Sequence, residues 1–141
     1  MTATDLIAEL VAPDAVRTAG LAGLLDAIDT RPGERPEETL LDLGLVDDRR
    51  LALSLAWRSG RPYQGLRGLV PDPRLFLYLP LSIANRERCV PLALRHESLR
   101  VASAFLDPDL GYLDGRFPNL RVELVVSPRR EILAALQEVA L

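Results

Sequence analysis

Apolar residues recur every three or four positions through the first sixty residues, which is the spacing of amphipathic helices. The first two predicted helices cover residues 6–12 and 13–28, with a turn before residue 34. A third and a fourth helix are predicted over residues 36–43 and 48–59. Four short helices in succession, each with one apolar face, predict an N-terminal helical bundle.

Capping residues set the expected bounds of the third and fourth helices. Pro36 suits the first position of the third helix, where no N–H is needed, and Gly44 suits its C-terminal end. Asp47 can cap the fourth helix with its carboxylate, and Gly60 ends that helix. The apolar face of the fourth helix is expected to carry Leu51, Leu55 and Trp57.

From residue 62 the pattern changes to short elements separated by prolines. Alternation of apolar and polar residues in 99–105 is typical of a half-buried strand. The predicted elements are two short helices and three strands, at residues 73–79, 81–86, 89–94, 99–105 and 120–126. Residues 95–98 suit a hairpin loop, and Ser127 and Pro128 suit the start of a last helix.

These patterns predict an α+β fold, in which an N-terminal helical bundle packs on a small mixed β-sheet with flanking short helices. We expect two subdomains in the 141-residue chain, a helical one over residues 1–61 and an α/β one over residues 62–141. Small domains bury a small fraction of their surface on folding, so we expect the two subdomains to share one core.

Composition excludes several kinds of chemistry. All 17 basic residues are arginine, so a Schiff-base lysine, a Walker A lysine and a lysine general base are absent. A net charge of −3 argues against an electrostatic footprint for duplex nucleic acid. No apolar run approaches the roughly 18–20 residues that cross a bilayer, and no basic segment precedes an apolar core at the N-terminus. We therefore expect a cytoplasmic chain without direct membrane insertion.

A series of short motifs follows the third predicted helix. They are Gly-Leu-Val at 44–46, Gly-x-Pro-Tyr at 60–63, Leu-Pro at 79–80, Val-Pro-Leu at 90–92, Leu-x-Val-Ala at 99–102, Asp-Pro at 107–108 and Leu-Arg-Val-Glu at 120–123. Their order resembles the N-terminal domain of the ATPases that drive type II secretion and type IV pilus assembly, a GspE-type domain related to the MshE-type cyclic di-GMP-binding domain. The family commonly has a helix after the Asp-Pro, and Gly111 and Gly115 predict that this helix is short here.

The resemblance implies a non-catalytic adaptor or regulatory domain. Such domains dock the ATPase to a cytoplasmic partner of the membrane platform, which would hold this chain at the periphery of the inner membrane. The phosphate-binding GxxxxGK[ST] loop of the motor is absent from these residues, so we expect no ATP hydrolysis and no cofactor. The chain is then either an excised N-terminal domain or a stand-alone relative.

Some relatives bind cyclic di-GMP through a motif whose second copy aligns with residues 35–58. The positions that carry the motif, or its remnant, are Arg35, Leu40, Leu41, Gly44, Leu45, Val46, Leu51, Leu55 and Arg58. A Leu-Gly pair of the motif is replaced by Pro36-Glu37, which brings bulk and negative charge to a phosphate position, and Arg58 replaces the final Gln. Two interpretations stay open: these leucines build the helical bundle, or the segment is a degenerate cyclic di-GMP sensor.

Two sets of residues are candidates for partner binding. Arg86 and Arg88 form, with Arg95 and Arg100, a basic patch that is either a solvated face or a contact for an acidic partner. The alternative is an apolar docking surface of exposed leucines, Leu66, Leu69 and Leu75.

The remaining reactive side chains favour structural roles. His96 lies in the predicted hairpin loop without an evident nucleophile beside it, and Cys89 is expected to be a small buried residue. Asp107, Asp109 and Asp114 have the spacing of turns rather than of a calcium loop, so we expect no metal site.

Overall fold

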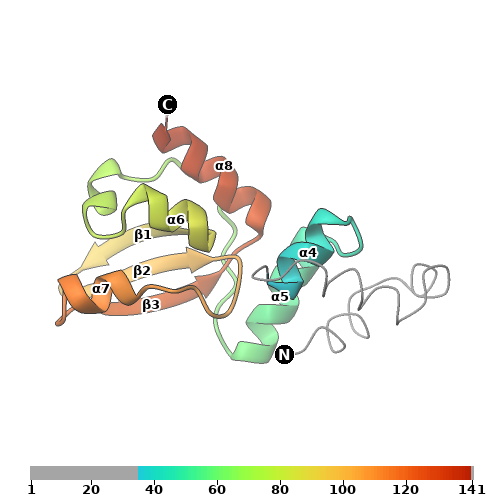
Figure 1. Ribbon diagram of the computed structural model, residues 1–141, viewed down its shortest axis with the longest axis horizontal. Coiled ribbons are helices and arrows are strands. Elements are labelled where there is room, and N and C mark those ends of the chain that lie inside the picture. Colours follow the sequence, from blue (N-terminus) through green and yellow to red (C-terminus); the bar gives the residue numbers. More distant parts are fainter. Residues whose placement is uncertain (1–34, 141) are drawn as a thin grey trace. The chain divides into compact units, whose positions relative to one another are not determined.

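The computed structural model describes residues 35–140 of the chain (Figure 1). Packing of the backbone divides the chain into two compact units, Met1–Leu51 and Ala52–Leu141. The described elements comprise helices and a mixed sheet, which confirms the predicted α+β class. The helices predicted over 6–12 and 13–28 lie outside the described residues, so the N-terminal bundle and the 1–61 and 62–141 division remain predictions.

Helix α4 (Pro36–Asp42) begins and ends as its sequence indicates. Pro36 occupies the first turn together with acidic side chains, where the helix dipole favours negative charge. Gly44 follows the helix with a φ of 70°, a left-handed conformation that costs glycine little. Within the turn that follows, the Asp47 carboxylate accepts a hydrogen bond from the Arg50 N–H at 3.0 Å. Both predicted capping roles are therefore confirmed.

Helix α5 (Asp48–Ser59) ends at Gly60, whose φ is 69°. Leu51 and Leu55 are buried, one turn apart on the same side of the helix. Trp57 is 87% exposed, and the expectation that it shares this apolar face is wrong. The reason is geometric, because a residue two positions after Leu55 lies about 200° further round the helix.

The sheet has the order β1-β2-β3. Strands β1 (Cys89–Arg95) and β2 (Ser98–Ser103) are antiparallel and joined by a tight turn, which confirms the predicted hairpin. The ladder is irregular between Pro91 and Ala93, where proline has no N–H to donate. Strand β3 (Arg121–Val126) runs parallel to β2 and pairs with its whole length.

A crossover connects β2 to the start of β3 and contains the short helix α7 (Gly111–Arg116). Its six residues confirm that two glycines shorten the helix after the Asp-Pro. The crossover is held to the preceding helix α6 (Leu81–Glu87), because the buried Glu87 carboxylate accepts a hydrogen bond from the Asp109 N–H at 2.6 Å. The Asp109 carboxylate in turn accepts from the Gly111 N–H, as expected of turn chemistry.

Helix α8 (Arg129–Ala140) packs against α6, β1 and β2 (Figure 1). Its buried stripe contains Ile132, Ala135 and Leu136. The Ser127 hydroxyl before this helix donates to the Gln64 carbonyl at 2.5 Å, which ties the helix start to the segment before the 3₁₀ helix η1 (Pro73–Leu77). In the central strand β2, every residue after Ser98 is buried except Arg100, so the core of this unit lies around β2.

Candidate functional site

The residues of the cyclic di-GMP motif remnant differ in accessibility. Leu40, Leu51 and Leu55 are buried, and Leu41 and Leu45 are half-buried. Fully buried leucines build the interior and present no aliphatic surface to a purine. This burial favours a structural role for most of the apolar positions of the motif remnant.

The arginines and the glycine of the motif remnant are partly or fully accessible. Arg35 is half-buried immediately before α4, and Arg58 is exposed near the end of α5; each already has an interaction within the chain. Gly44 has no atom within 4 Å of the position a Cβ would take. Its glycine is therefore required by the positive φ and not by a close neighbour.

The leucines predicted as a docking surface are mostly interior residues. Leu66 and Leu75 are buried, and the expectation that they are exposed is wrong. Leu75 lies on the inward side of η1, and Leu66 follows a segment that the Glu131 carboxylate holds through the Leu66 N–H at 2.6 Å. Leu69 is half-buried and stays a candidate.

The predicted arginine patch has local partners. Arg86 pairs with Glu87 at 2.9 Å, and the Arg88 guanidinium donates to the Asn85 carbonyl at 3.0 Å. Arg100 pairs with Glu123 at 3.0 Å across β2 and β3. Arg86 is largely exposed in its pair, so solvent screens the attraction and leaves the side chain available to a second carboxylate.

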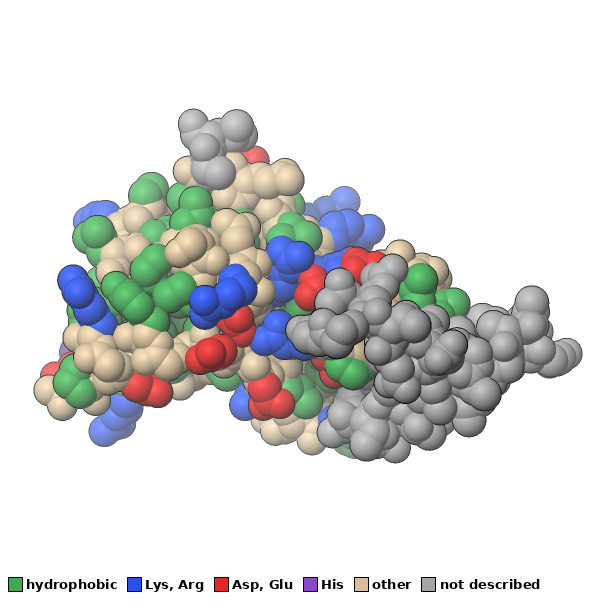
Figure 2. All heavy atoms as spheres, viewed as in Figure 1, with side chains coloured by type: hydrophobic (Ala, Val, Ile, Leu, Met, Phe, Trp, Pro, Cys, Tyr) green, Lys and Arg blue, Asp and Glu red, His purple; other side chains and the backbone are tan. Residues whose placement is uncertain are grey.

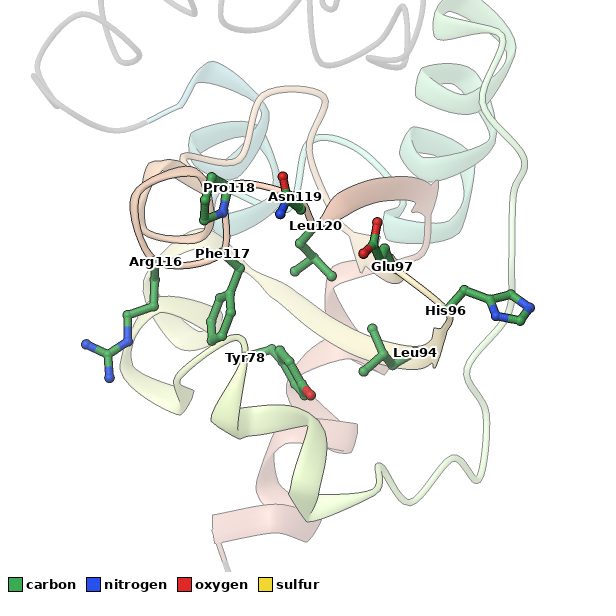
Figure 3. Close-up of a pocket in the computed structure, with 9 residues that line it drawn as sticks. All are labelled: Tyr78, Leu94, His96, Glu97, Arg116, Phe117, Pro118, Asn119 and Leu120. Atoms are coloured by element: carbon green, nitrogen blue, oxygen red, sulfur yellow. The ribbon is translucent and has the colours of Figure 1, made fainter.

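One hollow of the second unit lies at the end of the sheet where β1 ends and β3 begins (Figure 3). We call it the aromatic pocket; its volume is about 350 Å³, at the lower end of the range for ligand pockets. The lining residues are Tyr78, Leu94, His96, Glu97, Arg116, Phe117, Pro118, Asn119 and Leu120. They come from the end of η1, the β1–β2 hairpin and the loop between α7 and β3, so only the folded chain brings them together.

The floor of the aromatic pocket is apolar. The Tyr78 and Phe117 rings are in contact, with centroids 5.1 Å apart and planes tilted by 46°. Leu94 and Leu120 complete the floor, and all four side chains are half-buried. Aromatic side chains in a concave site are common anchors of protein interfaces.

Its rim is polar and carries both signs of charge. Glu97 lies on the hairpin side and Arg116 on the side of α7, while the His96 imidazole points away from the floor (Figure 3). The side chains of Glu97, Arg116 and Asn119 are exposed and make no hydrogen bond or ion pair with another described residue. An apolar floor, with exposed polar groups at its edge that form no bond to another described residue, suits a partner side chain flanked by polar atoms.

Three large apolar side chains of the described residues are mostly exposed. Trp57, Val70 and Leu77 are 87%, 67% and 76% exposed. Leu77 immediately precedes Tyr78 of the aromatic pocket. Figure 2 shows hydrophobic side chains gathered on the left of the view, over the end of β1, with arginines beside them. The sequence signal for the exposure of Leu77 was the run Leu-Phe-Leu-Tyr at 75–78. A short 3₁₀ helix cannot turn four consecutive apolar side chains toward the core.

His96 and Cys89 lie in the environments that the sequence predicted. His96 is exposed in the hairpin turn with a φ of 55°, and Cys89 is buried. Within residues 35–140, no three side chains of His, Cys, Asp or Glu are arranged to hold a metal ion. None of the described helices is both long and apolar enough to cross a bilayer.

One surface ion pair changes the titration of its members. Hydrogen bonds from the Arg74 guanidinium and N–H hold the pKa of Asp72 below its usual value. The Asp72 carboxylate, 2.8 Å away, raises the pKa of Arg74. Both groups are at the surface, and the Asp72 side chain caps the start of η1.

The fold and its sheet topology are those of the N-terminal domains of secretion and pilus ATPases. The sequence profile of the MshEN domain matches residues 59–140, more than half of the chain. The chain therefore belongs to the MshEN domain family, and the predicted resemblance to the N-terminal domains of GspE-type and PilB-type ATPases is confirmed.

Individual relatives agree with this assignment. The type IV pilus assembly ATPase PilB of Thermus thermophilus is 35% identical over 71 residues, which are 50% of this chain and 8% of that protein. The structure of MshE with cdg has a TM-score of 0.66 and 24% identity, with 99% of each chain covered. The N-terminal domain of XpsE has a TM-score of 0.64 and 23% identity, covering 98% of this chain and 96% of that one. At these identities, the two structures share the fold.

Proposed function

We propose that this chain is a non-catalytic adaptor or regulatory domain of a type II secretion or type IV pilus ATPase. The observation that carries the proposal is the MshEN match over residues 59–140, supported by the similarity to part of PilB. The domain would act on the cytoplasmic side of the inner membrane, docked to the cytoplasmic domain of a membrane-platform protein. Its contribution would be position and regulation, with the chemistry supplied by a motor.

We place the centre of docking at the aromatic pocket and the adjacent Leu77. The pocket offers a half-buried Tyr78 and Phe117, which a partner side chain can cover without disturbing the core. Covering a largely exposed leucine removes apolar surface from water, which stabilises a complex by about 25 cal/mol per Å². Leu69, Arg86 and Arg88 remain candidate contacts at the periphery, where charges contribute more to association rate than to affinity.

Isothermal titration calorimetry with the platform protein's cytoplasmic domain tests this assignment. We expect binding in the range of tens of micromolar or tighter. Leu77→Asp and Arg116→Glu change exposed side chains, so they should weaken binding about tenfold while the chain stays folded. Arg67→Glu makes the same charge change outside the pocket and is the matched control. Equal affinities for all three variants would remove the pocket from the interface.

A second candidate function is binding of cyclic di-GMP. It is favoured by the fold shared with MshE, whose structure was solved with cdg, and by Arg35 at the first position of the motif remnant. Glu37 in the first turn of α4 opposes it, because a carboxylate repels phosphate.

Calorimetry with cyclic di-GMP separates the two functions. If the chain is a sensor, the titration gives heat that Arg35→Ala abolishes and that the exposed Arg49→Ala leaves unchanged. Glu37→Gly should then strengthen binding, since it removes charge and bulk together. No heat at ligand concentrations in the range of hundreds of micromolar would leave the adaptor role alone.

A further inference from the structure

The main-chain groups of β3, an edge strand of the sheet, point alternately toward β2 and away from it. At the end of β3, the Val126 N–H donates to the Pro62 carbonyl at 2.8 Å, and the Val126 carbonyl accepts from the Gln64 N–H at 2.9 Å. Both groups therefore point away from β2. At the start of β3, the Arg121 N–H donates to the Glu97 carbonyl at 2.7 Å, on the β2 side. Directions alternate along a strand, so Val122 and Leu124 also point outward.

No described residue forms a main-chain hydrogen bond with the outward groups of Val122 and Leu124. The parallel bridge between Tyr63 and Val126 covers only the last residue of β3. Strand β3, which contains both residues, forms the lower edge of the sheet in Figure 1. Their side chains are half-buried, on the same face as the buried Leu99 and Val101. An apolar edge strand with unpaired main-chain groups is a template for another strand.

The charges on β3 favour a particular occupant. In antiparallel pairing, residues with outward groups must lie opposite one another, so only alternate registers are allowed. With Val122 opposite Val122 of a second copy, Arg121 lies directly opposite Glu123 of that copy. A shift by two residues in one direction places Arg121 against Arg121, and a shift in the other direction places Glu123 against Glu123. Only the central register is electrostatically complementary at both positions.

From this edge we infer that two copies of the chain associate through β3, antiparallel and centred on Val122, to form one continuous six-stranded sheet. The paired segment is 120–124, in which the Leu120 N–H already donates to the Phe117 carbonyl at 2.9 Å, so Leu120 offers only its carbonyl to Leu124 of the other copy. The segment ends before the Val126 position that residues 62–64 already occupy. Each Glu123, already 3.0 Å from Arg100, gains Arg121 of the other copy as a second partner. The contact is isologous and closes at two copies. It includes Leu120 at the floor of the aromatic pocket, but it does not rest on the proposed docking partner.

Sedimentation velocity of the 141-residue chain over a concentration series tests the inference. The weight-average mass should rise from 15.5 kDa toward twice that value, with micromolar affinity because the interface is small. Glu123→Arg or Arg121→Glu places like charges opposite each other twice, and should weaken the dimer by about tenfold. The double variant Arg121→Glu/Glu123→Arg restores complementarity and should restore the dimer. A chain that stays monomeric, that grows beyond two copies, or whose dimer ignores both single reversals overturns the inference.

A pair of proline variants tests the edge itself. Val122→Pro removes an outward N–H that the single chain does not use, so the monomer should keep its circular dichroism and lose dimerisation. Val125→Pro is the matched control, because its N–H points toward β2 and its loss should lower the melting temperature. A Val122→Pro chain that remains folded and still dimerises overturns the inference.

Discussion

Ser103 shows how a polar side chain is kept in the core of the second unit. Its hydroxyl donates to the Phe105 carbonyl at 2.6 Å and accepts from the Phe105 N–H at 3.1 Å, and the residue is buried. The side chain thus satisfies the main chain where β2 ends, which an apolar residue could not do.

Ser103→Ala leaves two buried main-chain groups of Phe105 without this partner. We expect the free energy of unfolding to fall by about 1–3 kcal/mol, measured by urea denaturation. Ser82→Ala, at an exposed position in α6, is the matched control and should change stability by less than about 0.5 kcal/mol. Equal stabilities for Ser103→Ala and the wild-type chain would contradict the structural role of the hydroxyl.

At the scale of elements, the β1–β2 hairpin contains a residue under backbone strain. His96 has a φ of 55°, a left-handed conformation that non-glycine residues adopt at a cost of roughly 1–2 kcal/mol. Nothing in the turn requires an imidazole, since the ring is exposed and points away from the aromatic pocket (Figure 3).

His96→Gly should therefore stabilise the hairpin. Relief of the strained φ outweighs the added freedom of glycine in the unfolded chain, so we expect the free energy of unfolding to rise by about 0.5–1 kcal/mol. Arg95→Gly, at the neighbouring strand position, should instead lower it. Thermal and urea unfolding measure both, and a destabilised His96→Gly chain would show that the side chain does contribute to the turn.

Local signals predicted most elements of the described part. Proline, glycine and Asp47 predicted the bounds of α4 and α5, because capping depends on neighbours in the sequence. The exposure of Trp57 and the burial of Leu66 and Leu75 depend on which side of a helix or loop meets the core. That is a tertiary property, and hydrophobicity alone does not determine it.

The aromatic pocket and the open edge of β3 could not be predicted from the sequence, because both depend on how the chain folds. The aromatic pocket joins Tyr78 to Phe117, residues separated in the sequence by α6, the hairpin and α7. The open edge of β3 depends on which residues point toward β2, which no periodicity of side chains shows. The motif remnant over 35–58 was visible in the sequence, and the burial of its leucines was not.

At the scale of the whole molecule, the described residues include a compact α/β unit with accessible surfaces. The MshEN family assignment supplies the class, and the aromatic pocket supplies a surface that a partner could cover. The chain spans only 8% of the PilB to which it is similar. In the proposed role, the domain would hold a large motor in place and leave the chemistry to that motor.

Titration calorimetry of this chain against the cytoplasmic domain of the proposed membrane-platform partner tests the adaptor role most directly. The proposed function predicts a saturable one-to-one complex in the range of tens of micromolar or tighter, weakened about tenfold by Leu77→Asp and unchanged by Arg67→Glu. Absence of binding at tens of micromolar, with the chain folded by circular dichroism, would contradict it.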